Sequence, residues 1–144
     1  MSDLTLVDAQ SIVNAALAKG GELGLKPIAV AVLDAGGQLK AFARQDAPAI
    51  LRADIAIGKA YGALAVGQGT RWLNRTALER PHFLVGLSGV SDGKIIPVIG
   101  GVLIKTESGR VIGAVGVSGD TSENDEVCGI AGIEAAGFVA DPGA

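Results

Sequence analysis

Residues 97–137 have the sequence PVIGGVLIKTESGRVIGAVGVSGDTSENDEVCGIAGIEAAG, and they carry the clearest structural signal in the chain. Val98–Lys105 and Arg110–Ser118 are dense in β-branched and small apolar residues, which is typical of strands. Thr106–Gly109 separates them, and its glycine can take the positive φ of a short hairpin loop. Because the apolar runs are nearly continuous, we expect both faces of these strands to be covered, by helices or by another subunit.

A helix is predicted directly after the second strand. Residues suited to N-capping follow Gly119, and three carboxylates (Glu123, Asp125 and Glu126) would occupy the first helical turn. A strand, a glycine and a helix N-terminus also describe a phosphate cradle. These carboxylates would repel an anion, and no Lys or Arg follows Arg110, so capping is favoured over phosphate binding.

The composition indicates a globular chain with little charge. Charged residues make up 19% of the 144 residues and apolar residues 49%, whereas soluble domains average about 25% charge. A surface short of charge is often covered by another subunit, so we expect a homo-oligomer. The net charge is −3 and no basic cluster is interleaved with aromatics, which argues against a nucleic-acid partner.

The cysteine count, the N-terminal residues and the length of the apolar runs predict a soluble cytoplasmic protein with no membrane partner. Cys128 is the single cysteine, so no disulfide can form within the chain. Met1–Leu4 lacks the basic and apolar parts of a secretory signal. The longest apolar run, Ile95–Ile104, is too short to span a bilayer and is interrupted by Pro97.

The first part of the chain predicts a helix and a hairpin. Thr5–Asp8 has the pattern of a capping box, and apolar residues recur at helical spacing up to Gly24. Ile28–Leu33 is an apolar strand, and Gln38–Arg44 alternates apolar and polar residues after a glycine-rich turn. The alternation predicts one face with Leu39, Ala41 and Ala43 and another with Lys40, Phe42 and Arg44.

Two further helices are predicted in the middle of the chain. The first begins at Asp46 or Ala47, before Pro48, and ends near Gly67. Gly58 and Gly62 lie four residues apart inside it, and each costs about 1 kcal/mol relative to alanine, so we expect them to permit close packing. Thr70 is predicted to cap a short helix that Arg80–Phe83 ends.

Leu84–Val90 and Lys94–Val98 are predicted as hairpin strands around a Ser91–Gly93 turn, and the Pro142–Gly143 tail as frayed. The order of elements does not alternate strand and helix as a parallel sheet requires. We therefore expect residues 1–144 to form one domain, with an antiparallel sheet on which helices pack.

Four segments carry a family resemblance: Val32–Gly37, Lys59–Tyr61, Pro97–Gly101 and, most specifically, Gly113–Thr121. They resemble the GlcG/HbpS family of haem-binding or haem-degrading domains, which also occurs as the C-terminal domain of PduO-type proteins. The resemblance implies an α+β fold, a profilin-like or PAS-like α-β-α sandwich with a central antiparallel sheet of about five strands and helices on its faces. It also implies haem as cofactor and homo-oligomers from dimer to octamer.

Haem binding needs an axial ligand, an apolar slot and cations for two propionates. The possible strong ligands are His82, Tyr61 and Cys128, with Met1 at the terminus. His82 suits a ligand or a general-base role, although a histidine in a loop is commonly only a surface residue. Tyr61 is otherwise a helix-packing residue, and Cys128 a buried apolar thiol.

With only five aromatic residues to line a pocket, a haem site is expected at an interface or in a shallow cleft. Arg71, Arg75 or Lys59 would then pair with the propionates. No metal site is predicted, because one histidine and one cysteine cannot supply a closed set of zinc ligands.

Two other functions remain open. The first is an enzyme for a small carboxylate-containing metabolite, with His82 as acid or base, Arg71 or Arg80 clamping the carboxylate, and Asp34 or Asp120 orienting the site. The second is an oligomeric scaffold or sensor without catalysis.

Any chemistry is expected where the segment Arg71–Phe83 meets the sheet. Asp120 and Thr121 are predicted to lie at the rim of that site.

Overall fold

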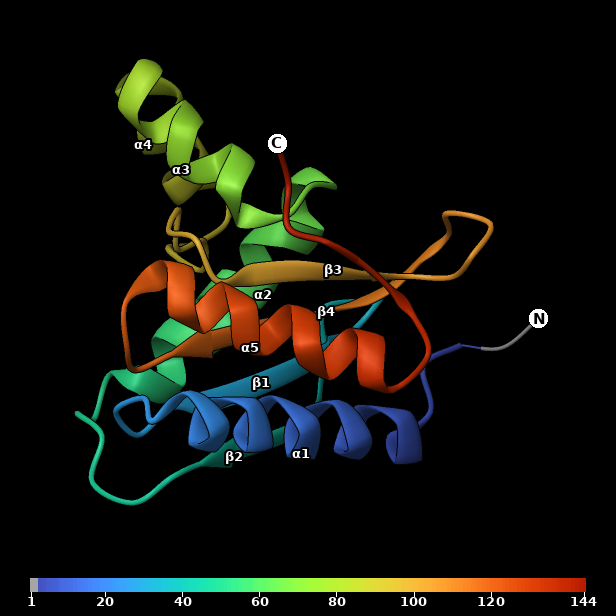
Figure 1. The fold of residues 1–144 in the computed structure, drawn as a ribbon. Coiled ribbons are helices and arrows are strands. Elements are labelled where there is room, and N and C mark those ends of the chain that lie inside the picture. The colour runs from blue at the N-terminus through green and yellow to red at the C-terminus, as the bar shows by residue number, and fades with distance from the viewer. Residues whose placement is uncertain (1–2) are drawn as a thin grey trace.

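The computed structural model describes residues 3–144, so the prediction for Met1 lies outside the described residues. The sheet has the strand order β2-β1-β4-β3-β5, with every neighbouring pair antiparallel. Helices α1 and α5 cover one face and α2 covers the other (Figure 1), as the predicted α-β-α sandwich requires. The elements are, in order, α1 Leu6–Leu23, β1 Ala29–Asp34, β2 Leu39–Arg44, α2 Arg52–Val66, α3 Thr70–Glu79, α4 Pro81–Val90, β3 Gly101–Lys105, β4 Val111–Ser118, α5 Ser122–Ala135 and β5 Val139–Asp141.

The two faces of the sheet are packed differently. The face under α1 and α5 carries the larger core, built mainly from valine and isoleucine side chains. The face under α2 is lined mostly by small residues, and α2 itself contributes alanines. A Cβ on Gly116 would lie 1.8 Å from the backbone oxygen of Ala56, and one on Gly101 would lie 2.2 Å from that of Lys59. The backbone of α2 therefore lies directly on the centre of the sheet.

Several local predictions are confirmed. The Thr5 hydroxyl accepts a hydrogen bond from the Asp8 backbone N–H at 3.0 Å, and Gly24 ends α1 in the left-handed conformation. Gly109 has a φ of 90° in the β3–β4 turn. Both of these central strands are buried on both faces. Thr121 caps α5 by accepting from the Asn124 N–H at 3.2 Å.

The predicted hairpin around Ser91–Gly93 is wrong. Its first strand is the helix α4, and its second, Lys94–Val98, has no strand structure. Pro81 was expected to end a helix, but it occupies the first turn of α4, where proline costs no hydrogen bond. The apolar run Leu84–Val90 was predicted as a strand, yet it is helical and none of the residues of α4 is buried in this chain.

Other boundaries also differ from the predictions. Helix α2 begins at Arg52, beyond Pro48. Thr70 is the first helical residue of α3, and its side chain bonds to Gly101 rather than capping the helix. The tail is not frayed, because β5 pairs with β3 and the Pro142 oxygen accepts from the Arg71 N–H at 3.1 Å.

The predicted alternation along β2 holds only in part. Ala41 and Ala43 pack against the larger core, whereas Phe42 pairs with Ala31 on the α2 face. The register shifts between Val32 and Leu33, so that Leu39 pairs with Leu33. A bulge of this kind places two residues opposite one, and it moves Leu39 to the face of Phe42. No helix among residues 3–144 is long and apolar enough to cross a membrane.

Candidate functional site

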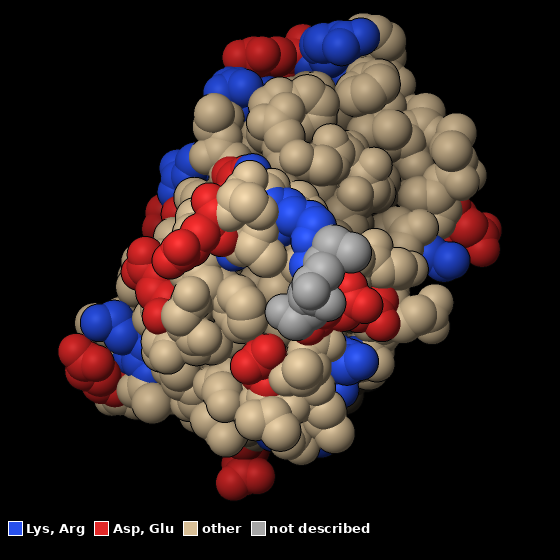
Figure 2. Space-filling view, turned by 90° about the vertical axis from the view of Figure 1, so that its right-hand side faces the viewer, with Lys and Arg blue, Asp and Glu red and all other residues tan. Residues whose placement is uncertain are grey.

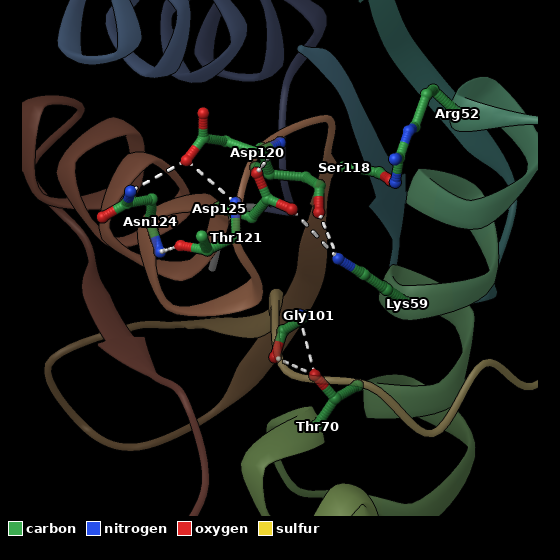
Figure 3. A network of polar contacts seen from close by, with 10 residues as sticks. Arg52, Lys59, Thr70, Gly101, Ser118, Asp120, Thr121, Asn124 and Asp125 are labelled. Carbon is green, nitrogen blue, oxygen red and sulfur yellow. Dashed lines mark hydrogen bonds and ion pairs between the residues drawn. The ribbon is translucent and has the colours of Figure 1, made fainter. Parts of the chain in front are cut away.

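A buried ion pair joins α2 to α5 beneath the end of β4 (Figure 3). The Lys59 Nζ lies 3.3 Å from the Asp125 Oδ2 and donates to the Val117 carbonyl at 2.8 Å. Both side chains are almost fully buried, at 3% and 1% exposure. Burial lowers the pKa of Lys59 and raises that of Asp125, and the attraction between them opposes both shifts. The predicted propionate partner Lys59 is thus closed off from any ligand within this chain.

Asp120 and Thr121 stiffen the loop between β4 and α5. The Asp120 carboxylate accepts from the Asn124 side-chain amide and from the Thr121 backbone N–H (Figure 3). It also accepts from the Lys26 backbone N–H at 2.9 Å. These bonds favour the ionised carboxylate and lower the pKa of Asp120 to about 2. An acid that is so firmly ionised, and already accepts three hydrogen bonds, is suited to hold a loop and not to exchange a proton.

The predicted arginines already have partners. Arg71 forms a two-point contact with Glu126, at 2.6 Å between Nη2 and Oε1 and 3.1 Å between Nε and Oε2. Arg75 donates to the backbone oxygen of Ala144. Arg80 lies over the Phe83 ring, 4.7 Å from its centroid.

His82 lies on α4, which packs mainly on α3 and not on the sheet. It lies exposed in the first turn of α4, which projects from the sandwich (Figure 1). Figure 2 shows a broad area without charged side chains at this end of the molecule. The Asp34 Oδ1 accepts from the N–H groups of Gly36 and Gln38 in its own turn. The structure therefore does not bring His82, Arg71 and Asp120 into one cleft as the enzyme hypothesis requires.

Cys128 is fully buried on α5. Burial, with a further contribution from Asp125, raises the pKa of its thiol to about 11. The thiol is therefore protonated at neutral pH and unsuited to be a nucleophile or an iron ligand. Among the described residues, no three or more His, Cys, Asp or Glu side chains lie together as a metal site.

A large cleft among the described residues lies between α2, the turn at Gly36–Gly37 and the segment that follows α4. Its volume of about 680 Å³ is within the range of sites for cofactors and small molecules. The lining is mostly apolar, with four aliphatic side chains and one aromatic ring. It consists of Gly36, Gly37, Gln38, Leu51, Asp54, Ile55, Ile57, Gly58, Tyr61, Gly93, Lys94 and Ile96.

Glycines shape the walls of this cleft. A Cβ on Gly58 would lie 2.4 Å from the Cγ1 of Ile96, so the predicted close packing on α2 is confirmed and it draws the segment 93–97 against the helix. Gly37, with a φ of 80°, brings the turn over the Tyr61 ring. The Lys94 Nζ lies 5.6 Å from the centroid of the same ring, within the range of a cation–π contact.

Exposed apolar side chains extend the cleft outward. Leu51 at its mouth is 60% exposed, and the adjacent Ile50 is 84% exposed. Leu39 follows Gln38 at the opposite border, and it is also exposed. This margin exists because α2 packs on β1, β3 and β4 and leaves the α2 face of β2 uncovered.

Of the predicted haem ligands, Tyr61 is the one that lines the cleft. Val32–Gly37 and Lys59–Tyr61, which carried the family resemblance, each contribute residues to it. From the sequence, a site was expected where Arg71–Phe83 meets the sheet, but none of those residues lines this cleft, and Lys94 and Ile96 were not identified. The signal that could have found them is the pair Gly58 and Gly62, since a helix with two such gaps needs side chains to fill them. The Ile96 side chain occupies the space beside Gly58. The Leu73 Cδ1 would lie 3.0 Å from a Cβ on Gly62.

The fold and the open cleft define a class of small α-β-α sandwich proteins. The structure is similar to that of PduOC, solved as a complex with haem, with a TM-score of 0.84 and 26% identity over 95% of this chain and 97% of that one. It is equally similar to the Klebsiella pneumoniae protein ORFY, with a TM-score of 0.84 and 30% identity over 94% and 92% of the two chains.

Sequence comparison gives the family. Residues 4–134 match the model of the family described as haem degrading protein HbpS-like, and the chain belongs to this family. It is also 35% identical, over 127 residues, to a 15.0 kDa protein from the dhaT–dhaS intergenic region of Citrobacter freundii. That alignment covers 88% of this chain and 87% of the relative.

Proposed function

We propose that this protein binds haem in the cleft between α2, the Gly36–Gly37 turn and the segment 93–97. The observation that carries the proposal is the cleft itself, about 680 Å³ in volume, largely apolar, and containing a tyrosine and a lysine. The family description and the haem complex of PduOC support haem as the ligand. Bound haem supplies an iron centre that can take ligands and electrons.

The residues of the cleft fit a flat, mostly apolar ligand. Ile55, Ile57 and Ile96 offer aliphatic surface to the ring. The glycines of the turn keep one wall free of side chains, so a planar group can approach the backbone closely. Tyr61 supplies a phenolic oxygen, a haem-iron ligand used in other proteins. In this proposal Tyr61 replaces His82 as the ligand within one chain.

A haemin titration followed by absorbance tests the proposal. We expect a sharp Soret shift that saturates at a fixed stoichiometry in the wild type. Tyr61→Phe should change the spectrum and weaken binding, because it removes the oxygen and keeps the ring. Leu51→Trp should weaken binding by filling the mouth of the cleft. His82→Ala is the matched control and should bind as the wild type does.

The opposite pattern would contradict the proposal. If His82→Ala abolished the saturable shift while Tyr61→Phe and Leu51→Trp left it unchanged, the haem would be held by α4 and not by the cleft. A broad shift that never saturates, in every variant, would remove haem binding altogether.

We also propose that a second copy covers α4 in a homo-oligomer. A ten-residue helix is marginally stable alone in water, yet α4 buries none of its residues in this chain. Its sequence, PHFLVGLSGV, contains no Lys, Arg, Asp or Glu, so side chains of these four types cannot repel one another when two copies of α4 approach. Light scattering should give a mass of at least two chains.

Haem degradation is the further activity that the family description suggests. Leu51, at the mouth of the cleft, is exposed to solvent, so a haem bound there would be reached by a reductant and by dioxygen. Haem degradation needs both of these reactants. We expect loss of the Soret band when ascorbate is added in air, and less loss in Leu51→Trp. A Soret band that outlasts that of free haemin would limit the function to binding.

A further inference from the structure

Resting on the proposed function, we infer that Lys94 holds the acidic edge of the ligand and so fixes its orientation in the cleft. Arg71 and Lys59, which sequence reasoning assigned to the propionates, pair with Glu126 and Asp125. Arg75 donates to the backbone oxygen of Ala144. Among the residues that line the cleft, Lys94 is the cation.

The turn after α4 sets the position of Lys94. Asp92 and Gly93 both have positive φ, 58° and 72°, and they reverse the chain at the end of the helix. The Gly93 N–H donates to the Ser88 oxygen at 2.7 Å, and the Lys94 N–H to the Ser91 oxygen at 3.3 Å. The first bond satisfies one of the last carbonyls of α4 and the second closes the turn after it, so the end of the helix also sets the direction of Lys94.

On the other side of Lys94, the chain is attached to α2. The Ile96 N–H donates to the Gly58 oxygen at 3.3 Å. The Lys94 carbonyl oxygen also lies close to Gly58, because a Cβ on Gly58 would be 3.2 Å from it. The base of the lysine is thus fixed at both ends, and its ammonium group rests near the Tyr61 ring.

The charges along the cleft are asymmetric. Asp54, Gly58 and Tyr61 lie on one face of α2, and seven residues of helix separate Asp54 from Tyr61 by about 10 Å. The ammonium of Lys94 stands at the Tyr61 end, and the Asp54 carboxylate marks the other. A ligand with its acidic groups on one edge, such as haem, is therefore attracted in one orientation and repelled in the opposite one.

The exposed cation–π contact of Lys94 is weaker than a charge-assisted hydrogen bond to a carboxylate. A propionate within reach of the Lys94 Nζ would accept such a bond. The aliphatic side chains of the cleft would meanwhile contact the apolar edge of the porphyrin. Lys94 is therefore a specificity-determining residue for carboxylate-bearing ligands, and iron is not needed for its action.

Iron-free porphyrins test this role separately from iron ligation. Binding of protoporphyrin IX and of its dimethyl ester is measured by fluorescence in the wild type, Lys94→Met and Lys40→Met. Methionine keeps an unbranched apolar side chain but removes the charge, and Lys40 is a lysine outside the cleft. We expect Lys94→Met to weaken the free acid by roughly tenfold, which corresponds to about 1.4 kcal/mol, and to leave the ester unchanged.

Salt gives a second readout. At an ionic strength of about 1 M, screening should weaken binding of the free acid to the wild type and to Lys40→Met, but not to Lys94→Met. Equal losses for acid and ester in Lys94→Met, or no loss for either, would overturn the inference while leaving haem binding in place. If neither porphyrin binds the wild type, or Leu51→Trp binds both as the wild type does, the cleft itself is wrong and the proposed function fails with the inference.

Discussion

The sandwich and helix α4 are stabilised in different ways. In the sandwich, α2 approaches the sheet so closely that Gly116 has no room for a Cβ, and a buried ion pair crosses from α2 to α5. Helix α4 has no buried residue, and a Cβ on its Gly86 would meet nothing within 4 Å. The sandwich is complete within one chain, whereas the apolar side chains of α4 are half-buried or exposed. The cleft lies on the sandwich, and the segment that follows α4 forms one of its walls.

The same substitution should act oppositely in the two regions, and this is the largest effect expected. Gly116→Ala places a methyl group 1.8 Å from the Ala56 oxygen, so the helix must move off the sheet. We expect a loss of at least about 3 kcal/mol in the free energy of unfolding. Gly86→Ala, in the exposed helix, should be neutral or stabilising by up to about 1 kcal/mol. Urea unfolding measures both, and equal effects would remove the contrast.

Breaking the buried ion pair should have the next largest effect. Lys59→Met leaves the Asp125 carboxylate buried without its cation, and we expect unfolding to become easier by about 3 kcal/mol. The double variant with Asp125→Asn should recover much of this loss, because no buried charge then remains. A double variant as unstable as Lys59→Met would show that packing at this position matters more than charge.

A smaller, pH-dependent effect is expected at Asp120. Its pKa in the folded chain is about 2, below the usual value near 3.8, so its ionised form favours folding at neutral pH. Asp120→Asn should lower stability at pH 7. The difference from the wild type should shrink as the pH falls through 3.8 towards about 2, where the carboxylate becomes protonated. A difference that stays constant over this range would assign the effect to the hydrogen bonds alone.

On α4 we expect the smallest effect on the stability of the chain and a large one on assembly. Val85 is 74% exposed in one chain, so Val85→Glu should change the free energy of unfolding of the isolated chain by less than about 0.5 kcal/mol. If a second copy covers α4, the same variant should give a lower mass in light scattering. An unchanged oligomer would mean that copies associate through another surface.

Local chemistry made much of the fold predictable from the sequence. The capping threonines, the glycines of the turns and the apolar strands each act through neighbours in the chain, so their signals are readable without tertiary information. Helix α4 was mistaken for a strand because its short apolar run before Ser91–Gly93 has no helical periodicity, and the helix buries none of its residues in this chain. Strand β5 was missed because three residues carry too little pattern, and pairing with β3 alone defines them.

The candidate site was less predictable because it depends on contacts between distant segments. Tyr61 was named from the sequence and lines the cleft. Lys59, Arg71 and Arg75 looked available as isolated cations, but tertiary contacts give each one a partner. Lys94 was not singled out for binding, since its approach to Tyr61 depends on the turn after α4.

The most direct test of haem binding in the cleft is the position of the iron in crystals grown with haemin. Anomalous scattering at the iron absorption edge locates this atom without reference to the rest of the ligand. We predict one strong peak in the cleft, within bonding distance of the Tyr61 oxygen, with the propionate edge towards Lys94. A peak beside His82 on α4, with the cleft free of haem, would contradict the proposed function.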